Sequence, residues 1–427
     1  MLGMFLGLAL LMFLAYKGMS IIWIAPLCAL VVALTGGLAL LPAYTDTYMT
    51  GFVNFTRSWF PVFMLGAIFG KVMEETGMAQ SVANWFAKTI GAKQALLAVV
   101  LGCAMLTYGG VSLFVVVFAM YPLAIALFRE ANLSRKLIPG AIALGSFTFT
   151  MTALPGTPQI QNLIPREHFG TNAAAAPILG IAAALVMFIG GMIYLKWKEG
   201  KLTAAGDLFT EPKQGVKEIN VSTLPHPLLA FLPLFAVVGT LNLLKWPIIP
   251  ALLSGILLTI VLKPSVIPNL VSVFNAGANG SIIAIINTSA AVGFGMVVRA
   301  VPAFKQLTEF VMGIEGNPLV SPAVAVNILA GATGSASGGL GIALTALGKE
   351  YLAIAQATGI DPAVFHRIAS LSSGGLDTLP HNGAVLTLLA VTGLTHKDSY
   401  FDIFIVSLVL PIVSVIVAIA LASFGIV

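Results

Sequence analysis

Long apolar runs, separated by short polar segments, make up almost the whole chain. In the first half they cover about 2–16, 21–42, 58–75, 94–128, 136–165 and 174–195. In the second half they cover about 227–243, 246–263, 281–299, 318–357, 362–393 and 399–425. A helix that crosses a membrane needs about 20 mainly apolar residues, which most of these runs provide. The pattern therefore predicts an all-α polytopic membrane protein.

The second half of the chain repeats the first at an offset of 225 positions. Aligned pairs are Phe69 with Phe294, Gly109 with Gly334, Ser112 with Ser337 and Pro155 with Pro380. Membrane-embedded repeats with paired helix breaks are typical of secondary transporters. We therefore expect a first repeat at 1–195 and a second at 226–427, joined by a polar linker at 196–225.

One apolar stretch in each repeat is interrupted by glycines. The interruptions lie at 107–110 in the first repeat and at 331–339 in the second. Each half of such a stretch has about 14–18 residues, at or below the length of one crossing. Two short crossings and one re-entrant hairpin both remain possible. The glycine clusters favour a hairpin whose tip lies at mid-depth, where non-helical backbone is tolerated only against protein or water.

The next stretch in each repeat contains a proline break, at 152–158 and at 376–383. A hairpin and a broken helix together leave five crossings per repeat, and an odd number of crossings turns the second repeat over. The predicted fold therefore has two inverted five-crossing repeats, each with a re-entrant hairpin and a broken helix.

Composition supports the membrane interpretation and orients the chain. Hydrophobic residues make up 58% of the 427 positions and charged residues only 9%, with a net charge of +5; soluble domains carry about 25% charged residues. The excess of lysine and arginine lies in loops, so it indicates topology and not a nucleic-acid partner. With the lysine-rich linker in the cytoplasm, both termini are expected on the extracytoplasmic side of a bacterial inner membrane.

Four unwound segments, a hairpin tip and a helix break from each repeat, are expected to meet near the bilayer centre. Each exposes N–H groups at the start of a helix, which favour a small anion, and hydroxyl groups add hydrogen bonds. No arginine lies in these segments. The alternative is that the small residues serve close helix packing. The expected substrate-binding residues are Thr107, Tyr108, Gly109, Gly110, Ser112, Thr152, Gly156, Thr157, Thr333, Gly334, Ser335, Ser337, Thr378, His381 and Asn382.

Asp377 is the single acid in the predicted central region. A carboxylate inside a membrane is costly and marks a functional site by default. It could carry a coupling proton, with His381 sharing it. It could equally bind Na⁺ near Thr378 and Ser335, or act only as a helix cap. We expect the coupling role, with H⁺ before Na⁺.

The sequence carries no sign of an enzyme. It has no phosphate-binding glycine-lysine loop and no histidine or cysteine cluster with metal-ligand spacing. A hydrolase built on Ser337, His381 and Asp377 would need a water-filled site and an oriented base. No catalytic residue, cofactor or structural metal is expected.

Several motifs together resemble one family. The run from Gly66 to Met73, the following Gly77 to Gln80 and the break at Pro155-Gly156-Thr157 resemble the GntP family of gluconate/proton symporters, part of the ion-transporter superfamily. The element Gly334-Ser335-Ala336 also matches that family. The resemblance extends over essentially the whole chain.

The two breaks differ from those of the gluconate members and are similar to those of hydroxybutyrate-type permeases in the family. The resemblance implies an elevator-type carrier, in which a transport part slides against a scaffold, and a homodimer. The scaffold would comprise 1–75 and 226–299, and the transport part 94–195 and 318–427.

These inferences favour a cation-coupled symporter of a small organic monocarboxylate, such as 3-hydroxybutyrate or a gluconate-like hydroxy acid. A Na⁺-coupled symporter of the same fold is one alternative. An anion channel or a non-transporting membrane scaffold is another, although a channel should show a continuous polar stripe along several helices.

Overall fold

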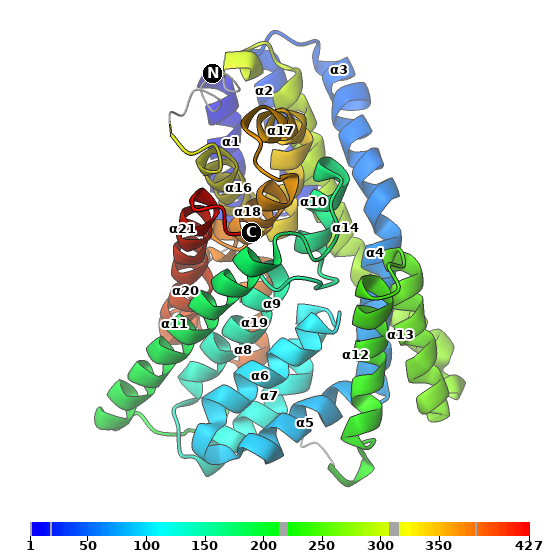
Figure 1. Ribbon diagram of the computed structural model, residues 1–427, viewed down its shortest axis with the longest axis vertical. Coiled ribbons are helices and arrows are strands. Elements are labelled where there is room, and N and C mark those ends of the chain that lie inside the picture. The colour runs from blue at the N-terminus through cyan, green and yellow to red at the C-terminus, as the bar shows by residue number, and fades with distance from the viewer. Residues whose placement is uncertain (1, 18, 213–220, 307–315, 381) are drawn as a thin grey trace.

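The computed structural model describes residues 2–17, 19–212, 221–306, 316–380 and 382–427, and in these residues the chain forms helices joined by loops, without a β-strand (Figure 1). The helices of the first half are α1 (Leu2–Tyr16), α2 (Ile21–Thr35), α3 (Leu40–Pro42), α4 (Met49–Glu75), α5 (Met78–Ile90), α6 (Ala95–Tyr108), α7 (Leu113–Glu130), α8 (Ile138–Ser146), α9 (Phe149–Thr152), α10 (Ile160–Phe169) and α11 (Pro177–Ala204). A π-helical segment, η1 (Ala43–Tyr48), joins α3 to α4, and short 3₁₀ turns are η2 (Ala92–Gln94) and η3 (Arg135–Leu137).

The helices of the second half are α12 (Pro227–Asn242), α13 (Ile248–Leu262), α14 (Leu270–Ala300), α16 (Val320–Thr333), α17 (Ala336–Thr358), α18 (Pro362–Ser373), α19 (Gly383–Thr392), α20 (His396–Phe404) and α21 (Leu410–Ser423). The intervening 3₁₀ turns are η4 (Val221–Thr223), η5 (Pro264–Asn269) and η6 (Leu376–Thr378), and η7 (Ile405–Val409) is a π-helical segment. The sequence also predicts an amphipathic segment at about 303–313, most of which lies at 307–315, outside the described residues.

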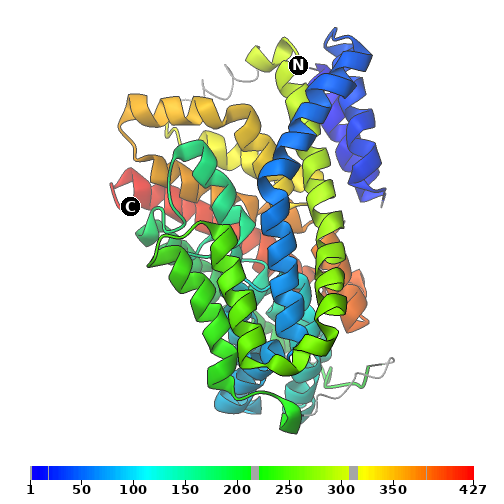
Figure 2. The same cartoon turned by 90° about the vertical axis from the view of Figure 1, so that its right-hand side faces the viewer.

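Helix boundaries recur at the offset found in the sequence. Helix α6 spans Ala95–Tyr108 and α16 spans Val320–Thr333, so both limits differ by 225 positions. The two helix pairs that flank the glycine interruptions, α6–α7 and α16–α17, lie toward opposite ends of the long axis (Figures 1 and 2). In both views the first pair lies at the lower end and the second at the upper end.

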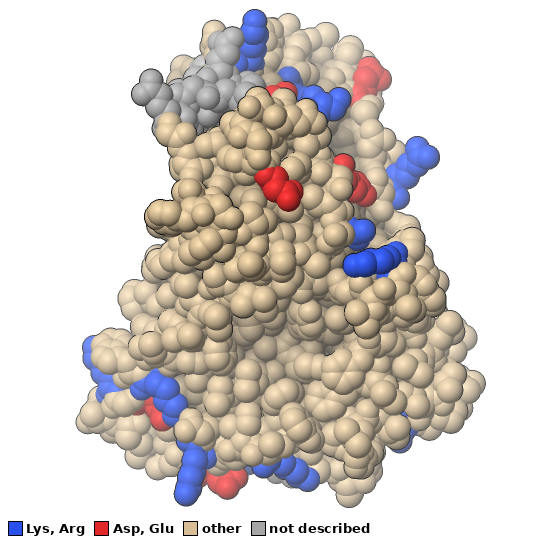
Figure 3. All heavy atoms as spheres, viewed as in Figure 1, with Lys and Arg blue, Asp and Glu red and all other residues tan. Residues whose placement is uncertain are grey.

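Several helices are long and apolar enough to cross a membrane. Within the described residues they are Leu40–Glu75, Pro177–Ala204, Pro264–Ala300 and His396–Ser423, to which the pair Met78–Ile90 and Ala92–Tyr108, bent by 100°, adds a broken span or re-entrant loop. Charged side chains gather toward the two ends of the molecule and leave an uncharged band between them on the face in Figure 3. The chain is therefore a polytopic helical membrane protein, as the hydropathy pattern predicts.

Two helices begin earlier than the apolar pattern predicts. The run at 58–75 belongs to a helical segment that begins at Leu40, and the run at 281–299 belongs to one that begins at Pro264. Polar side chains lower the hydropathy of a segment without ending its helix. Thr56, for example, donates from Oγ1 to the carbonyl of Phe52 at 2.8 Å and lies 2.7 Å from Ser289 Oγ on α14. This contact joins the two long helices.

Close packing of α16 against α17 depends on Gly339. A Cβ at this position would meet the backbone N and Cα of Ala330 on the opposite helix. The main chains of the pair therefore approach so closely that only glycine fits, as in other small-residue helix contacts within membranes.

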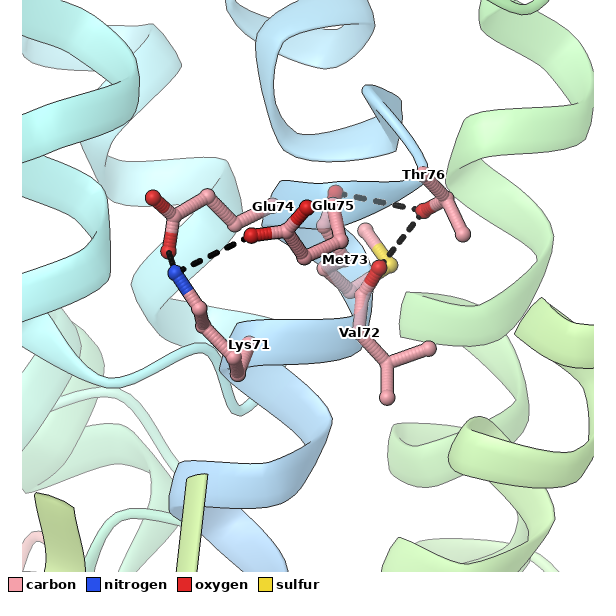
Figure 4. Close-up of polar contacts among 6 residues, drawn as sticks. All are labelled: Lys71, Val72, Met73, Glu74, Glu75 and Thr76. Atoms are coloured by element: carbon pink, nitrogen blue, oxygen red, sulfur yellow. Dashed lines mark hydrogen bonds and ion pairs between the residues drawn. The ribbon is translucent and has the colours of Figure 1, made fainter. Parts of the chain in front are cut away.

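The end of α4 carries the surface ion pair that the spacing of Lys71 and Glu75 predicts. Nζ of Lys71 lies 3.1 Å from Glu74 and 3.2 Å from Glu75 (Figure 4). The hydroxyl of Thr76 donates to the carbonyl of Val72 at 2.7 Å and closes the helix end. Partly exposed pairs of this kind contribute about 0–1 kcal/mol, so they mark a helix end more than they stabilise it.

The first part of the linker is held against the ends of α7 and η3. Arg129 forms a two-point ion pair with Glu211, each contact at 2.8 Å. Lys136 and Ser134 both donate to the carboxylate of Asp207. Burial raises the pKa of Asp207, but the hydrogen bonds from Lys136 and Ser134 outweigh this effect and hold the pKa below its usual range.

We predict that Gly339→Ala destabilises the protein. The added methyl group forces α16 and α17 apart, and overpacking of this kind costs about 1–3 kcal/mol. Thermal unfolding of the purified protein in detergent measures the effect. Gly239→Ala is the matched control, because a Cβ at Gly239 on α12 meets nothing within 4 Å. Equal unfolding midpoints for the two variants would contradict the packing argument.

Candidate functional site

A cavity of about 430 Å³ lies between the two halves of the chain. Its wall includes residues from α4 and α14, from both helix pairs and from both helix breaks. The polar side chains among the lining residues are Ser20, Ser112, Gln159, Gln161, Ser281, Asn287, Thr288, Thr333, Ser335, Ser337, Asp377, Thr378 and Asn382. None of the described lining residues is a lysine or an arginine.

Four helices begin at this cavity. Their N-cap residues, Ser112 before α7, Gln159 before α10, Ser335 before α17 and Asn382 before α19, all line it. The first N–H groups of a helix have no partner within the helix and carry partial positive charge. An arrangement in which four such ends converge on one cavity is suited to a small anion.

The four N-caps differ in what they leave open. Ser335 accepts from the N–H of Gly338 at 3.1 Å, and Asn382 accepts from two N–H groups of α19 at 2.7 and 2.9 Å. Ser112 and Gln159 make no capping bond with their side chains. Side-chain capping therefore does not occupy the first-turn N–H groups of α7 and α10, although that of Asn162 in α10 donates to the carbonyl of Gln159 at 3.0 Å.

Asp377 lies in η6, in the second break, and lines the cavity with a relative exposure of 4%. Its Oδ1 has no hydrogen-bond partner within the described residues. The amide nitrogen of Asn382 donates to the carbonyl of Asp377 at 3.0 Å and to that of Gly334 at 2.9 Å. The second break is thereby tied to the second hairpin tip, while one oxygen of the carboxyl group stays unpaired.

Thr378, the residue after Asp377, is hydrogen-bonded to residues of α20 and η7. Thr378 donates from its hydroxyl to the carbonyl of Ser407 at 3.0 Å, and the hydroxyl of Tyr400 donates to the carbonyl of Thr378 at 3.1 Å. These bonds satisfy an unwound segment without using the carboxyl group of Asp377. Oδ1 of Asp377 therefore remains without a partner among the described residues.

The cavity gathers more than half of the residues that the sequence singles out. Gly110, Ser112, Thr333, Gly334, Ser335, Ser337, Asp377, Thr378 and Asn382 line it. Thr107, Tyr108, Gly109, Thr152, Gly156 and Thr157 do not. His381 lies outside the described residues.

Hydrogen bonds within the protein hold most of the first break, of which only Pro158 lines the cavity. The hydroxyl of Tyr108 donates to the carbonyl of Pro155 at 3.0 Å, and Asn242 at the end of α12 donates to the carbonyl of Gly156 at 2.8 Å. The carbonyl of Thr107 accepts from Gln159 at 2.6 Å. These contacts hold the segment together, and the start of α10 faces the cavity in its place.

An arginine that the sequence does not assign to any break lies against the first one. Arg367 on α18 is fully buried. It donates to the carbonyl of Ala175 from Nε at 3.0 Å and from Nη2 at 2.7 Å, to the carbonyl of Thr152 from Nη1 at 3.3 Å, and to Oδ1 of Asn162 at 2.9 Å. The guanidinium group of the second half therefore holds the C-terminal end of α9 in the first half.

Six polar residues of the cavity are not among those that the sequence predicts: Ser20, Gln159, Gln161, Ser281, Asn287 and Thr288. Gln159 and Gln161 follow the proline break directly, so their distance from the break could have indicated them. Asn287 and Thr288 lie within the long helix α14, where polar side chains in an apolar run were the available signal.

Comparisons with known proteins agree with this architecture. The model of the GntP family permeases matches residues 1–238. The chain is 45% identical over 448 aligned residues to a protein of Bacillus subtilis (strain 168) named "Uncharacterized transporter YxjC", and the alignment covers 95% of each chain. The chain belongs to the GntP family of permeases.

A second relative of this GntP-family permease is more distant. It is a Haemophilus influenzae protein named "Uncharacterized permease", 24% identical over 408 residues, with 87% of this chain and 81% of the relative covered. Family membership confirms the resemblance found in the sequence. Together with the apolar helices, it identifies a multi-pass membrane transporter.

We predict that Arg367→Met destabilises the permease, because the carbonyl of Ala175 loses its buried donor, whereas the carbonyl of Thr152 keeps the hydroxyl of Ser370 as a donor at 2.8 Å. Each buried acceptor left unpaired costs about 1–3 kcal/mol. Thermal unfolding in detergent measures the loss. Arg57→Met, at an exposed position on α4, is the matched control. An unchanged unfolding midpoint for Arg367→Met would show that the guanidinium group does not hold the first break.

Proposed function

We propose that this GntP-family permease is a secondary active symporter of a small organic monocarboxylate, driven by a cation, with H⁺ favoured. The observation that carries the proposal is the meeting of four helix N-termini and one buried carboxyl group with an unpaired oxygen at a single cavity. The N-termini suit a negative group, and the carboxyl group suits a positive one. Both ligands can thus occupy one site.

The cavity wall favours a short monocarboxylate. Its volume of about 430 Å³ suits a small molecule, and apolar side chains such as Phe147, Met151 and Leu386 line part of it. A second carboxylate would meet neither lysine nor arginine among the described lining residues and would lie near Asp377. Substrates such as 3-hydroxybutyrate or a gluconate-like hydroxy acid fit these conditions.

Asp377 is the proposed coupling residue. An ionised carboxylate with an unpaired oxygen is costly inside a membrane, so it gains from a proton or a metal ion. Protonation needs no further ligand, whereas Na⁺ requires several oxygen atoms, for which Thr378 and Ser335 are candidates. His381 is proposed to assist proton transfer because it follows Asp377 by four residues. Na⁺ coupling is the alternative within the same fold.

The transport movement is proposed to follow from two inverted repeats in the bacterial inner membrane, with both termini on the extracytoplasmic side. The opposite placement of the two helix pairs (Figures 1 and 2) and the recurring helix boundaries support the inversion. In the proposed elevator mechanism, 94–195 and 318–427 move against a scaffold of 1–75 and 226–299. A homodimer would anchor that scaffold. Occupancy of both ligands would permit the movement.

We predict that Asp377→Asn abolishes concentrative uptake into proteoliposomes but leaves exchange of labelled for unlabelled substrate. The amide cannot carry the coupling charge, although it keeps the size of the side chain. The matched control is Asp361→Asn at the exposed N-cap of α18, where asparagine caps as well as aspartate. Concentrative uptake by Asp377→Asn would contradict the assignment.

Imposed gradients distinguish the two coupling ions. We predict uptake of labelled 3-hydroxybutyrate or gluconate into proteoliposomes under an inward H⁺ gradient without Na⁺. Uptake only under an inward Na⁺ gradient would select the alternative. Electrical conductance without saturable uptake would instead favour an anion channel, and neither response would favour a non-transporting scaffold.

A further inference from the structure

Asn287 lies within α14 and lines the cavity, and its side-chain amide has no hydrogen-bond partner among the described residues. It is half-buried, and its Oδ1 is buried without a partner. The next residue, Thr288, donates to the carbonyl of Ala284 at 2.9 Å and lies 3.4 Å from Ser337 Oγ. This turn of α14 is therefore held beside the start of α17, with the amide of Asn287 uncommitted.

Gln161 presents a second unused amide from the first half of the chain. It lies in the first turn of α10, has a relative exposure of 7% and lines the same cavity. Its Oε1 is also buried without a partner. The neighbouring Gln159 differs, because its amide nitrogen donates to the carbonyl of Thr107 at 2.6 Å. The unpaired state of Gln161 is thus not general to this helix end.

The two unpaired side-chain amides would be satisfied by a ligand that both donates and accepts hydrogen bonds. A carboxamide offers N–H donors and a carbonyl acceptor. A carboxylate can only accept, and four helix N-termini at the cavity already offer it donors. A metal ion would use only the carbonyl oxygens. A hydroxyl group both donates and accepts, so it alone among these groups satisfies both halves of an amide.

We propose that Asn287 and Gln161 are specificity-determining residues that bind a hydroxyl group of the transported acid. The inference rests on the proposed function, since it assumes that an organic carboxylate occupies the cavity. An acid without a hydroxyl group would leave the amides unpaired, and a site built to bind a hydroxyl discriminates strongly against such an analogue. A keto acid, which only accepts, should bind with intermediate affinity.

The test compares acids that differ only in hydroxyl groups. Binding of 3-hydroxybutyrate and butyrate, and of gluconate and hexanoate, is measured by calorimetry on the purified wild-type protein. The same is done for Asn287→Leu and Gln161→Met, which keep the approximate side-chain volume. Asn275→Leu is the control, because Asn275 lies on the same helix as Asn287 but is exposed and does not line the cavity.

For the wild type and Asn275→Leu, we expect a preference of about tenfold or more for the hydroxy acid in at least one pair. In Asn287→Leu and Gln161→Met the preference should fall to about threefold or less. Binding of butyrate and hexanoate should be retained or improved. Leucine and methionine have no polar group that an acid without hydroxyl groups would leave unpaired. Acetoacetate should lie between 3-hydroxybutyrate and butyrate in the wild type.

Each contrary result has a separate meaning. An unchanged preference in both variants, or an equal loss of both acids, overturns the role of the amides but leaves carboxylate transport intact. A wild-type protein with no preference in either pair overturns the inference without any variant, so a variant that fails to fold does not protect it. A wild-type protein that binds none of the four acids overturns the proposed function as well.

Discussion

Backbone N–H and C=O groups that lie outside a helix but inside a membrane need hydrogen-bond partners within the protein. The helix breaks and hairpin tips around the cavity of this permease depend on that constraint. The two helix breaks meet it with side chains from distant elements. Arg367 and Ser370 bind the carbonyl of Thr152 at the first break, and Asn382 binds carbonyls at the second break and the second hairpin tip. These donors satisfy carbonyl groups that have no partner within a helix.

The C-terminal and N-terminal ends of the helices around the cavity meet this constraint in different ways. The carbonyl ends near the first break are occupied by protein donors, namely Arg367 for Thr152 and Gln159 for Thr107. The amino ends of α7, α10, α17 and α19 face a shared cavity instead. Carbonyl groups near the first break thus have protein donors, while the amino ends of α7 and α10, which have no side-chain cap, lie at the cavity, and this difference underlies the proposed binding of an anion.

Much of the helical architecture follows from periodicity and composition. The expected interruption at 107–110 coincides with the end of α6 at Tyr108, and the expected break at 152–158 lies between α9 and α10. Glycine and proline leave these signals because they change local backbone preferences. The early starts of the helical segments at Leu40 and Pro264 were missed, since polar side chains lower hydropathy without ending a helix.

Local composition and short motifs are enough to predict an all-helical membrane transporter of the GntP family and the ends of many of its helices. Which of these helix ends share a cavity depends on how the helices pack together. This packing placed Thr152 behind the wall, brought Arg367 to a break in the other half, and set Gln161 and Asn287 at the same cavity. Such placements depend on lateral packing between segments far apart in the chain, which hydrophobic periodicity does not encode.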